Sequence, residues 1–338
     1  MYVYNRFFGA GIPPNRHPMT SKPVGISSPI LSMVLAGITL VAVWLPVANS
    51  IAGKRPVSAT APQLQGQPPS AAEMSARTEK LLANQHADDE ALELYQRVER
   101  HIDRSGDAPY RIIDDKTYRV VPTGAGTQKI LLRDGDKPVD AATYNRGMRV
   151  LAEVLRAMAD PNDPKARAAL AKRQKRARDR AEFVDAMKEA FLSKWLSVDT
   201  RNGRQCDVVE LDPNPNFHPH SMFQNALSHV TAKIWVDRES NQLVWGEAHV
   251  MSDISIGGGI LGKVYRGSRI SMEQEEVAPG IWLPTHYRYD FTGRKFLFAF
   301  QEHETIDVSH YHRIGSPKEA LALVEAELAG GKTYMDDP

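Results

Sequence analysis

Four histidines stand in two pairs whose spacing could chelate a metal ion. His218 and His220 flank a proline, and His310 and His312 flank Tyr311. Residues two apart on an extended chain face the same way, so each pair could supply two ligands. The sequence holds no H-E-x-x-H pattern, however, and spacing alone is a weak signal. We expect loop histidines near strand ends, no metal and no cofactor; a metal-dependent envelope hydrolase is the weaker alternative.

Gly257, Gly259 and Gly262 match the G-x-G-x-x-G spacing of dinucleotide-binding loops. That motif requires a helix after it, whereas the stretch that follows, KVYRGSRISME, is typical of another strand. The glycines therefore predict a turn or bulge between antiparallel strands. G-x-S-x-G is absent, and Cys206, the single cysteine, begins a strand as a small buried hydrophobe would. We predict no catalytic residue and a protein that is not an enzyme.

The first 52 residues are typical of an export segment. Ile30 to Ala48 is almost wholly apolar and follows basic residues, and small residues then allow cleavage after Ser50. Because Pro46 breaks a helix just before that point, a cleaved signal peptide is favoured over an uncleaved transmembrane helix that anchors the chain. Translation from Met19 would give a signal of ordinary length. Either interpretation places the remaining chain in the periplasm or cell envelope.

Charge and composition exclude other classes. The 338 residues hold 42 Lys and Arg against 41 Asp and Glu, and 42% are hydrophobic. The export segment has three basic residues and no acidic one, so the exported part is slightly acidic overall. This balance argues against nucleic acid as a partner. Residues 53–71, rich in Pro, Gln and Ser, predict a disordered linker. Residues 72–338 then form the folded domain.

Periodicity predicts helices and strands in this domain. A helix is expected from about Ala71, and Asp140 is the expected N-cap of another that runs through Met158. A helical insertion follows at about 160–200. Its first half is strongly basic, and its second half carries apolar residues at helical spacing as far as Trp195. Ser316 to Glu319 forms a capping box that opens a C-terminal helix.

Six strand-like segments lie between the insertion and that helix. They are residues 205–211, 229–236, 242–254, 263–277, 281–291 and 295–306. The turns between them, such as Thr292-Gly293-Arg294, are too short for crossover helices, so the strands must pair antiparallel. Phe296, Phe298 and Phe300 would then share one strand face. The fold class is α+β, with one curved antiparallel sheet.

Three stretches carry a resemblance to a known family: KIWVDRESNQLVWGEAHV, GGGILGKVYRGSRI and EVAPGIWLPTHYRYDFTGRKFLF. Together they are similar to outer-membrane lipoprotein-sorting-like proteins, in the uncharacterised bacterial branch of the LolA-like superfamily. The resemblance covers roughly Ala91 to Arg313. It implies a half-barrel of antiparallel strands wrapped around helices, with an apolar face that holds acyl chains. The helical insertion departs from the simple carrier pattern.

The leading hypothesis is a periplasmic or envelope protein that binds a lipid or lipoprotein acyl chain, with a role in lipoprotein or lipid trafficking. Six aromatic residues are the candidate lipid-binding set: Trp235, Trp245, Trp282, Phe296, Phe298 and Phe300. The alternative is an envelope sensor or scaffold that binds a protein partner through the same fold, with Lys165–Trp195 as the contact. An uncleaved N-terminal segment would add membrane association and favour that alternative.

Overall fold

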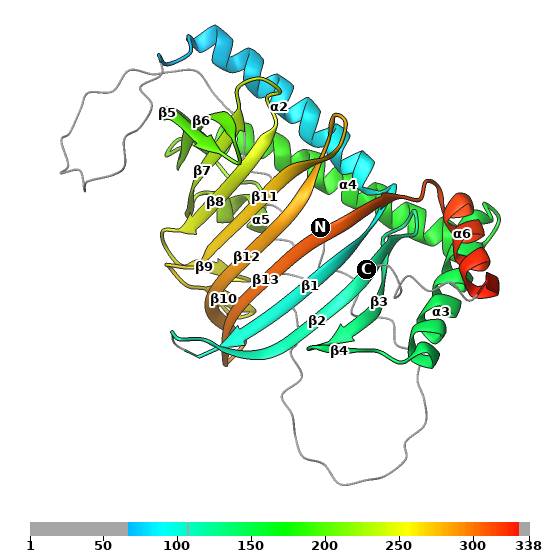
Figure 1. The fold of residues 1–338 in the computed structure, drawn as a ribbon. Coiled ribbons are helices and arrows are strands. Elements are labelled where there is room, and N and C mark those ends of the chain that lie inside the picture. Colours follow the sequence, from blue (N-terminus) through cyan, green and yellow to red (C-terminus); the bar gives the residue numbers. More distant parts are fainter. Residues whose placement is uncertain (1–66, 107, 331–338) are drawn as a thin grey trace.

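The computed structural model describes residues 67–106 and 108–330, and its strands form a single sheet (Figure 1). The strands are β1 (Tyr95–Ser105), β2 (Arg111–Pro122), β3 (Thr127–Asp134), β4 (Lys137–Pro138), β5 (Phe191–Arg201), β6 (Arg204–Pro213), β7 (Val230–Asp237), β8 (Leu243–Val250), β9 (Ile254–Ile256), β10 (Gly262–Val264), β11 (Arg269–Ala278), β12 (Ile281–Lys295) and β13 (Phe298–Arg313). The helices are α2 (Ala71–Leu92), α3 (Ala141–Ala159), α4 (Pro164–Ala190), α5 (Met222–Leu227) and α6 (Pro317–Gly330).

The sheet is antiparallel, as predicted, and runs in the order β4-β3-β2-β1-β13-β12-β11-β8-β7-β6-β5. The short strands β9 and β10 pair with each other, and β10 extends β12. Strand β13 returns beside β1, which joins the first four strands to the rest of the sheet. The predicted α+β fold with one curved sheet, helices and a C-terminal helix is confirmed.

The helices divide between the two faces of the sheet. One face, here the α2/α4 face, packs its largest apolar cluster against Met74 and Leu81 of α2, Met187 of α4 and Leu227 of α5. Alternate residues of the strands point to the opposite face, the α3/α6 face. There, apolar side chains of β1, β2 and β3 pack against α3 and α6.

Helix α2 lies across one end of the strands (Figure 1). Arg77 pairs with Asp207 of β6, and the Gln85 side chain donates to the Gln274 side chain of β11 over 3.0 Å. Both partners are buried in the sheet, so α2 is fixed to its strand ends by polar bonds as well as apolar contact.

The predicted helical insertion is confirmed as far as Ala190 and wrong beyond it. Helix α4 ends at Ala190, and Phe191 and Trp195 belong to β5, which pairs with β6. Asn214 ends the helix, because its side chain donates to the Glu189 carbonyl and its backbone N–H to the Ala190 carbonyl. The apolar residues whose spacing fits a longer helix belong in part to the end of α4 and in part to the start of β5.

The predicted turn at Thr292-Gly293-Arg294 is also wrong, because these residues continue β12 and pair with β13. The turn lies at Phe296 and Leu297, and Phe296 adopts a left-handed φ of 52°. Gly293 marks a close approach instead of a turn. A Cβ there would stand 2.2 Å from the Lys263 carbonyl oxygen and 2.9 Å from the Phe300 ring.

Several local predictions are confirmed. Asp140 caps α3 by accepting the Thr143 N–H, and Ser316 and Glu319 form the expected capping box before α6. The glycine-rich segment joins the antiparallel strands β9 and β10. Within residues 67–106 and 108–330, the structure contains no helix long and apolar enough to span a membrane. The export segment and most of the linker lie outside the described residues.

Candidate functional site

A continuous apolar surface covers the α2/α4 face of the sheet. It crosses the sheet from β6 to β13. Ile234, Met272 and Ile306 lie in one cross-strand row, linked through Gly246 and Tyr287, and all three are buried. The strands contribute mainly β-branched and aliphatic side chains, which suit a pleated surface covered by helices. Phe291 and Tyr289 extend it along β12 toward the end of the sheet that lies away from α2.

Phe300 and Phe298 continue this surface to the open end of the sheet. Phe300 lies opposite Gly293 and packs, half-buried, against the apolar cluster. Two residues earlier on the same strand face, Phe298 is 78% exposed. The missing side chain of Gly293 leaves the space that the Phe300 ring occupies. Apolar side chains thus lead from solvent at Phe298 into the buried cluster.

The three candidate tryptophans lie on the opposite face of the sheet. Trp235, Trp245 and Trp282 form a separate apolar cluster with Cys206 and Val208. The six predicted residues therefore do not share one surface. Phe298 and Phe300 lie on the α2/α4 face, the tryptophans belong to a different cluster, and Phe296 is 50% exposed in the turn between β12 and β13.

Arginines cover the tryptophan rings. The Arg201 guanidinium lies 3.8 Å from the centroid of the Trp245 ring and 5.0 Å from that of Trp235. Arg204 lies 4.6 Å from the centroid of Trp282. Such stacking attracts the cation to the electron-rich face of the ring. The cluster consequently already has partners from this chain on its ring faces.

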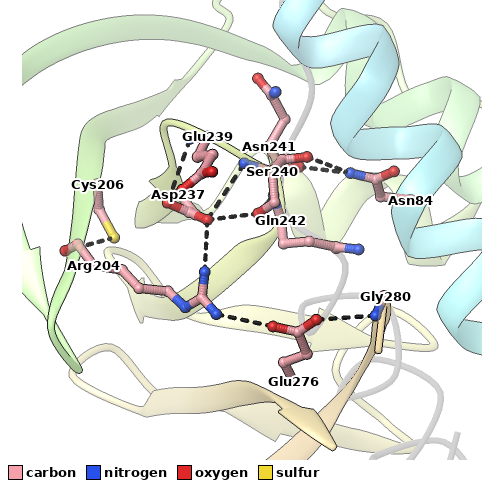
Figure 2. Close-up of polar contacts among 10 residues, drawn as sticks. All are labelled: Asn84, Arg204, Cys206, Asp237, Glu239, Ser240, Asn241, Gln242, Glu276 and Gly280. Atoms are coloured by element: carbon pink, nitrogen blue, oxygen red, sulfur yellow. Dashed lines mark hydrogen bonds and ion pairs between the residues drawn. The ribbon is translucent and has the colours of Figure 1, made fainter. Parts of the chain in front are cut away.

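Figure 2 shows how Arg204 is held over that cluster. Its guanidinium pairs with Asp237 at 3.3 Å and with Glu276 at 3.0 Å, which links β6 to the C-terminal ends of β7 and β11. Asp237 also accepts from the Ser240 hydroxyl, and Asn84 of α2 donates to the Ser240 carbonyl. This network joins β6, β7 and β11 to α2, and we therefore assign it a role in holding the fold together.

Cys206 lies beside this network, fully buried, and its thiol donates to the Arg204 carbonyl over 3.7 Å. Burial, followed by the charges of Asp237 and Asp199, raises the pKa of the thiol to about 12. A thiol of that pKa does not form the nucleophilic thiolate at neutral pH. The prediction of a buried hydrophobic cysteine is confirmed.

A cluster of ionised side chains bounds the apolar surface on β1. Glu99 is 2% exposed; it pairs with Arg97 at 3.0 Å, with Lys129 at 2.9 Å and with the His101 ring at 2.9 Å. The other His101 nitrogen lies 2.7 Å from Glu304 of β13. His101 pairs directly with Ile306 of the apolar cluster, so charge and apolar surface meet side by side on one face.

The pKa shifts follow from these contacts. Burial would raise the pKa of Glu99, but the charges of Lys129 and Arg97 outweigh it and hold the pKa well below its ordinary value. Burial would lower the pKa of His101, but hydrogen bonds to Glu304 and Glu99 outweigh it and raise the pKa. The imidazolium can donate to both carboxylates at once.

Sequence reasoning missed this cluster, although its signal is visible in the sequence. Arg97, Glu99, His101 and Asp103 alternate along YQRVERHIDRS, which places four ionisable side chains on one strand face. That alternation is also compatible with a solvated face. Only the pairing of β1 with β13 shows that these side chains meet Glu304 beside a core.

The histidine pairs considered first have other surroundings. His218 and His220 are exposed in the connection before α5, and His310 bonds to the Ser309 hydroxyl at 2.8 Å. In the part of the chain that the structure describes, no group of three or more His, Cys, Asp or Glu side chains is placed to hold a metal ion.

Comparisons with known proteins find similarity in solved structures only. No protein-family model matches the sequence, and no curated protein matches it. The chain is similar in fold to a putative outer membrane lipoprotein-sorting protein domain from Vibrio parahaemolyticus, at 9% identity over 73% of this chain and 99% of that one, with a TM-score of 0.30.

Two further structures show the same similarity. A LolA superfamily protein from Nitrosomonas europaea has 9% identity over 70% of this chain and 96% of that one, with a TM-score of 0.28. A DUF1329 family protein from Desulfovibrio piger has 11% identity over 69% and 93%, with a TM-score of 0.22. The predicted resemblance thus appears among solved folds.

Proposed function

We propose that this chain is a non-enzymatic protein of the periplasm or cell envelope that binds an acyl chain of a lipid or lipoprotein on its α2/α4 face. One observation carries the proposal: apolar side chains lead from exposed Phe298, through Phe300, to Phe291 of the buried cluster on β12, beside the carboxyl of Glu302. Surfaces lined mainly by apolar side chains, with polar groups at their margin, are typical of ligand sites.

The free energy for binding would come from burial of methylene groups. Each buried methylene contributes about 0.8 kcal/mol. Part of this is offset by the freedom that the chain loses on binding. The acyl chain would enter at Phe298 and displace the Phe300 ring or lie along it. The ionised cluster around Glu99 limits the apolar surface on its β1 side, so a polar head group is expected nearer that margin.

The test is the lipid content of the purified protein. The full chain is expressed, exported, purified and extracted with organic solvent, and the extract is analysed by mass spectrometry. We expect a phospholipid or acylated species in a fixed ratio to protein. Phe300→Ser should lower that ratio, because it breaks the apolar path at its centre. The control Leu323→Ser alters a side chain that is also half-exposed, but on α6.

An empty extract from correctly folded protein would contradict the proposal. So would an equal loss of lipid in Phe300→Ser and Leu323→Ser, because that result would point to contamination or unfolding in place of a bound chain. Circular dichroism of both variants shows whether they keep the fold. A metal-dependent hydrolase and a protein scaffold, the alternatives from the sequence, make no prediction of a stoichiometric lipid.

A further inference from the structure

Large apolar side chains are exposed mainly at one end of the molecule. Among the residues that the structure describes, nine of the thirteen exposed ones lie at the strand ends farthest from α2. They are Tyr110, Ile112, Ile113, Met251, Ile260, Leu261, Phe296, Leu297 and Phe298. The other four are scattered over α3, α4, β5 and α6. Single exposed apolar residues need no explanation, but such a concentration marks an interaction site. We call these nine residues the apolar end.

Two turns of the apolar end are tied together. The Phe296 N–H donates to the Leu261 carbonyl over 3.1 Å, and Arg294 donates to the carbonyls of Gly259 and Phe296. The β9–β10 turn and the β12–β13 turn therefore form one unit. The β1–β2 connection lies on the other side of β13. There the Tyr110 ring stacks on the His303 ring of β13, with the ring centroids 4.4 Å apart.

The side chains at the tips of these turns are nearly free of protein contact. Leu297 is 90% exposed, Phe298 78% and Ile260 75%. The β9–β10 turn is shaped by three successive glycines, all with left-handed φ, and it ends in Ile260 and Leu261. Apolar side chains that stand apart in this way match the fluid acyl-chain region of a bilayer, because fluid chains can surround each side chain whatever its shape.

Among the described residues, basic side chains outnumber acidic ones around the tips. The connections that carry the apolar end, with their flanking residues, hold five basic side chains among their described residues, namely Arg111, Lys263, Arg266, Arg294 and Lys295. The acidic side chains there are Asp253, which pairs with Lys263 at 3.0 Å, and Asp114, which follows Ile113 and pairs with Lys116. Apolar residues flanked by Lys and Arg are the combination that binds the interface of an anionic bilayer.

We propose that the apolar end docks the protein onto an anionic phospholipid bilayer, with Leu297, Phe298 and Ile260 inserted among the acyl chains and the basic side chains at the lipid phosphates. This inference goes beyond acyl-chain binding and does not require it. The two fit together, because Phe298 belongs both to the apolar end and to the path toward Phe300. A chain leaving the bilayer would reach the α2/α4 face without crossing water.

The experiment places an environment-sensitive fluorophore on the full chain at Leu297→Cys. The native Cys206 is fully buried and its thiol has a raised pKa, so it is not labelled. The control carries the same label at Leu323→Cys on α6, a half-exposed leucine outside the apolar end. Both proteins keep the N-terminal apolar segment, so any anchoring by that segment is common to both.

Vesicles of phosphatidylglycerol and phosphatidylethanolamine are then added. We expect a blue shift and a several-fold rise in emission for the label at 297, quenching by lipids brominated on the acyl chain, and little change at 323. Reversal of a basic charge, Arg111→Glu, should raise the lipid concentration that gives half of this response roughly tenfold or more. The reason is that each Lys or Arg near an anionic surface contributes about 1 kcal/mol to binding. Arg149→Glu, on α3, is the matched control.

Equal responses at 297 and 323, or no response at 297, would overturn the docking proposal. A label at 297 that responds to lipid-free envelope protein but not to vesicles would also overturn it, in favour of a protein partner. These outcomes are independent of the lipid extraction. Docking without bound lipid would contradict the proposed function alone, and bound lipid without docking would contradict this inference alone.

Discussion

The pKa of Glu302, which lies on the α2/α4 face, is set by the side chains around it. It lies on β13 two residues from Phe300 and opposite Phe291 of the apolar cluster. Burial, followed by the charges of Glu304 and Asp103, raises its pKa from 4.5 to about 7. A carboxyl that resists ionisation in the fold but not in the unfolded chain makes folding depend on pH.

The sign of that dependence follows from the raised pKa. Below about pH 4.5 Glu302 is protonated in both states. Between about pH 4.5 and 7 the unfolded chain releases this proton while the fold retains it, so stability falls over that range and the loss is complete above about pH 7. Glu302→Gln should therefore raise the free energy of unfolding at pH 8 by about 1–3 kcal/mol and leave it unchanged at pH 4.5. Urea unfolding at both pH values measures this.

The exposed Glu79→Gln on α2 is the control for that series, and it should change stability little at either pH. A loss of stability at pH 8 in Glu302→Gln would contradict the assignment of Glu302 as a half-buried carboxyl whose ionisation destabilises the fold.

Glu99 is the opposite case, a buried carboxylate held ionised by its partners. Glu99→Gln leaves Arg97, Lys129 and His101 without their shared anion, so it should destabilise the protein by about 3–5 kcal/mol at pH 7. Chemical denaturation measures the loss. Asp179→Asn removes the exposed Lys175 pair on α4 and should cost less than about 1 kcal/mol. Similar losses in both variants would contradict the account of Glu99.

At the scale of elements, Gly293 of β12 leaves the space that the Phe300 ring and the neighbouring strand β10 occupy. Gly293→Ala would place a Cβ against the Lys263 carbonyl and the Phe300 ring, so β10 or Phe300 must move. We expect a loss of about 1–3 kcal/mol in thermal or chemical unfolding. Gly330→Ala at the end of α6 meets nothing within 4 Å and serves as control. An unchanged stability in Gly293→Ala would refute this role.

Element types could largely be predicted from periodicity, whereas two boundaries could not. The spacing from Met187 to Trp195 fits a helix, but Asn214, which ends α4 at Ala190, is distant in the sequence. Likewise Gly293 suggests a turn until the approach of β10 is known. In both cases the deciding contact is made by a segment outside the local pattern.

The candidate site could be predicted only in part, for a related reason. Alternation shows which side chains share a strand face, but it does not show which helices cover that face. Trp235 and Ile234 are adjacent apolar residues in β7, yet Ile234 joins the α2/α4 cluster and Trp235 the arginine-covered cluster. Phe298 and Phe300 share a strand face, as alternation predicts, and that face is the α2/α4 face; their role in lipid binding stays a prediction.

At the scale of the whole molecule, the two faces of the sheet and one end have different proposed roles. The tryptophan cluster and the clusters on α3 and α6 hold the fold together, the α2/α4 face would bind the acyl chain, and the apolar end would meet the bilayer. The central claim is the location of the chain. It separates this account from one in which lipid binds among Trp235, Trp245 and Trp282.

Photocrosslinking with a fatty acid that carries a photoactivatable group on its acyl chain tests this claim most directly. After irradiation and digestion of the full-length protein, mass spectrometry locates the adducts. We predict adducts on Phe298, Phe300 and neighbouring residues of β12 and β13, and their loss when unlabelled fatty acid competes. Adducts confined to the peptides that contain the three tryptophans, or adducts that do not compete, would contradict the account.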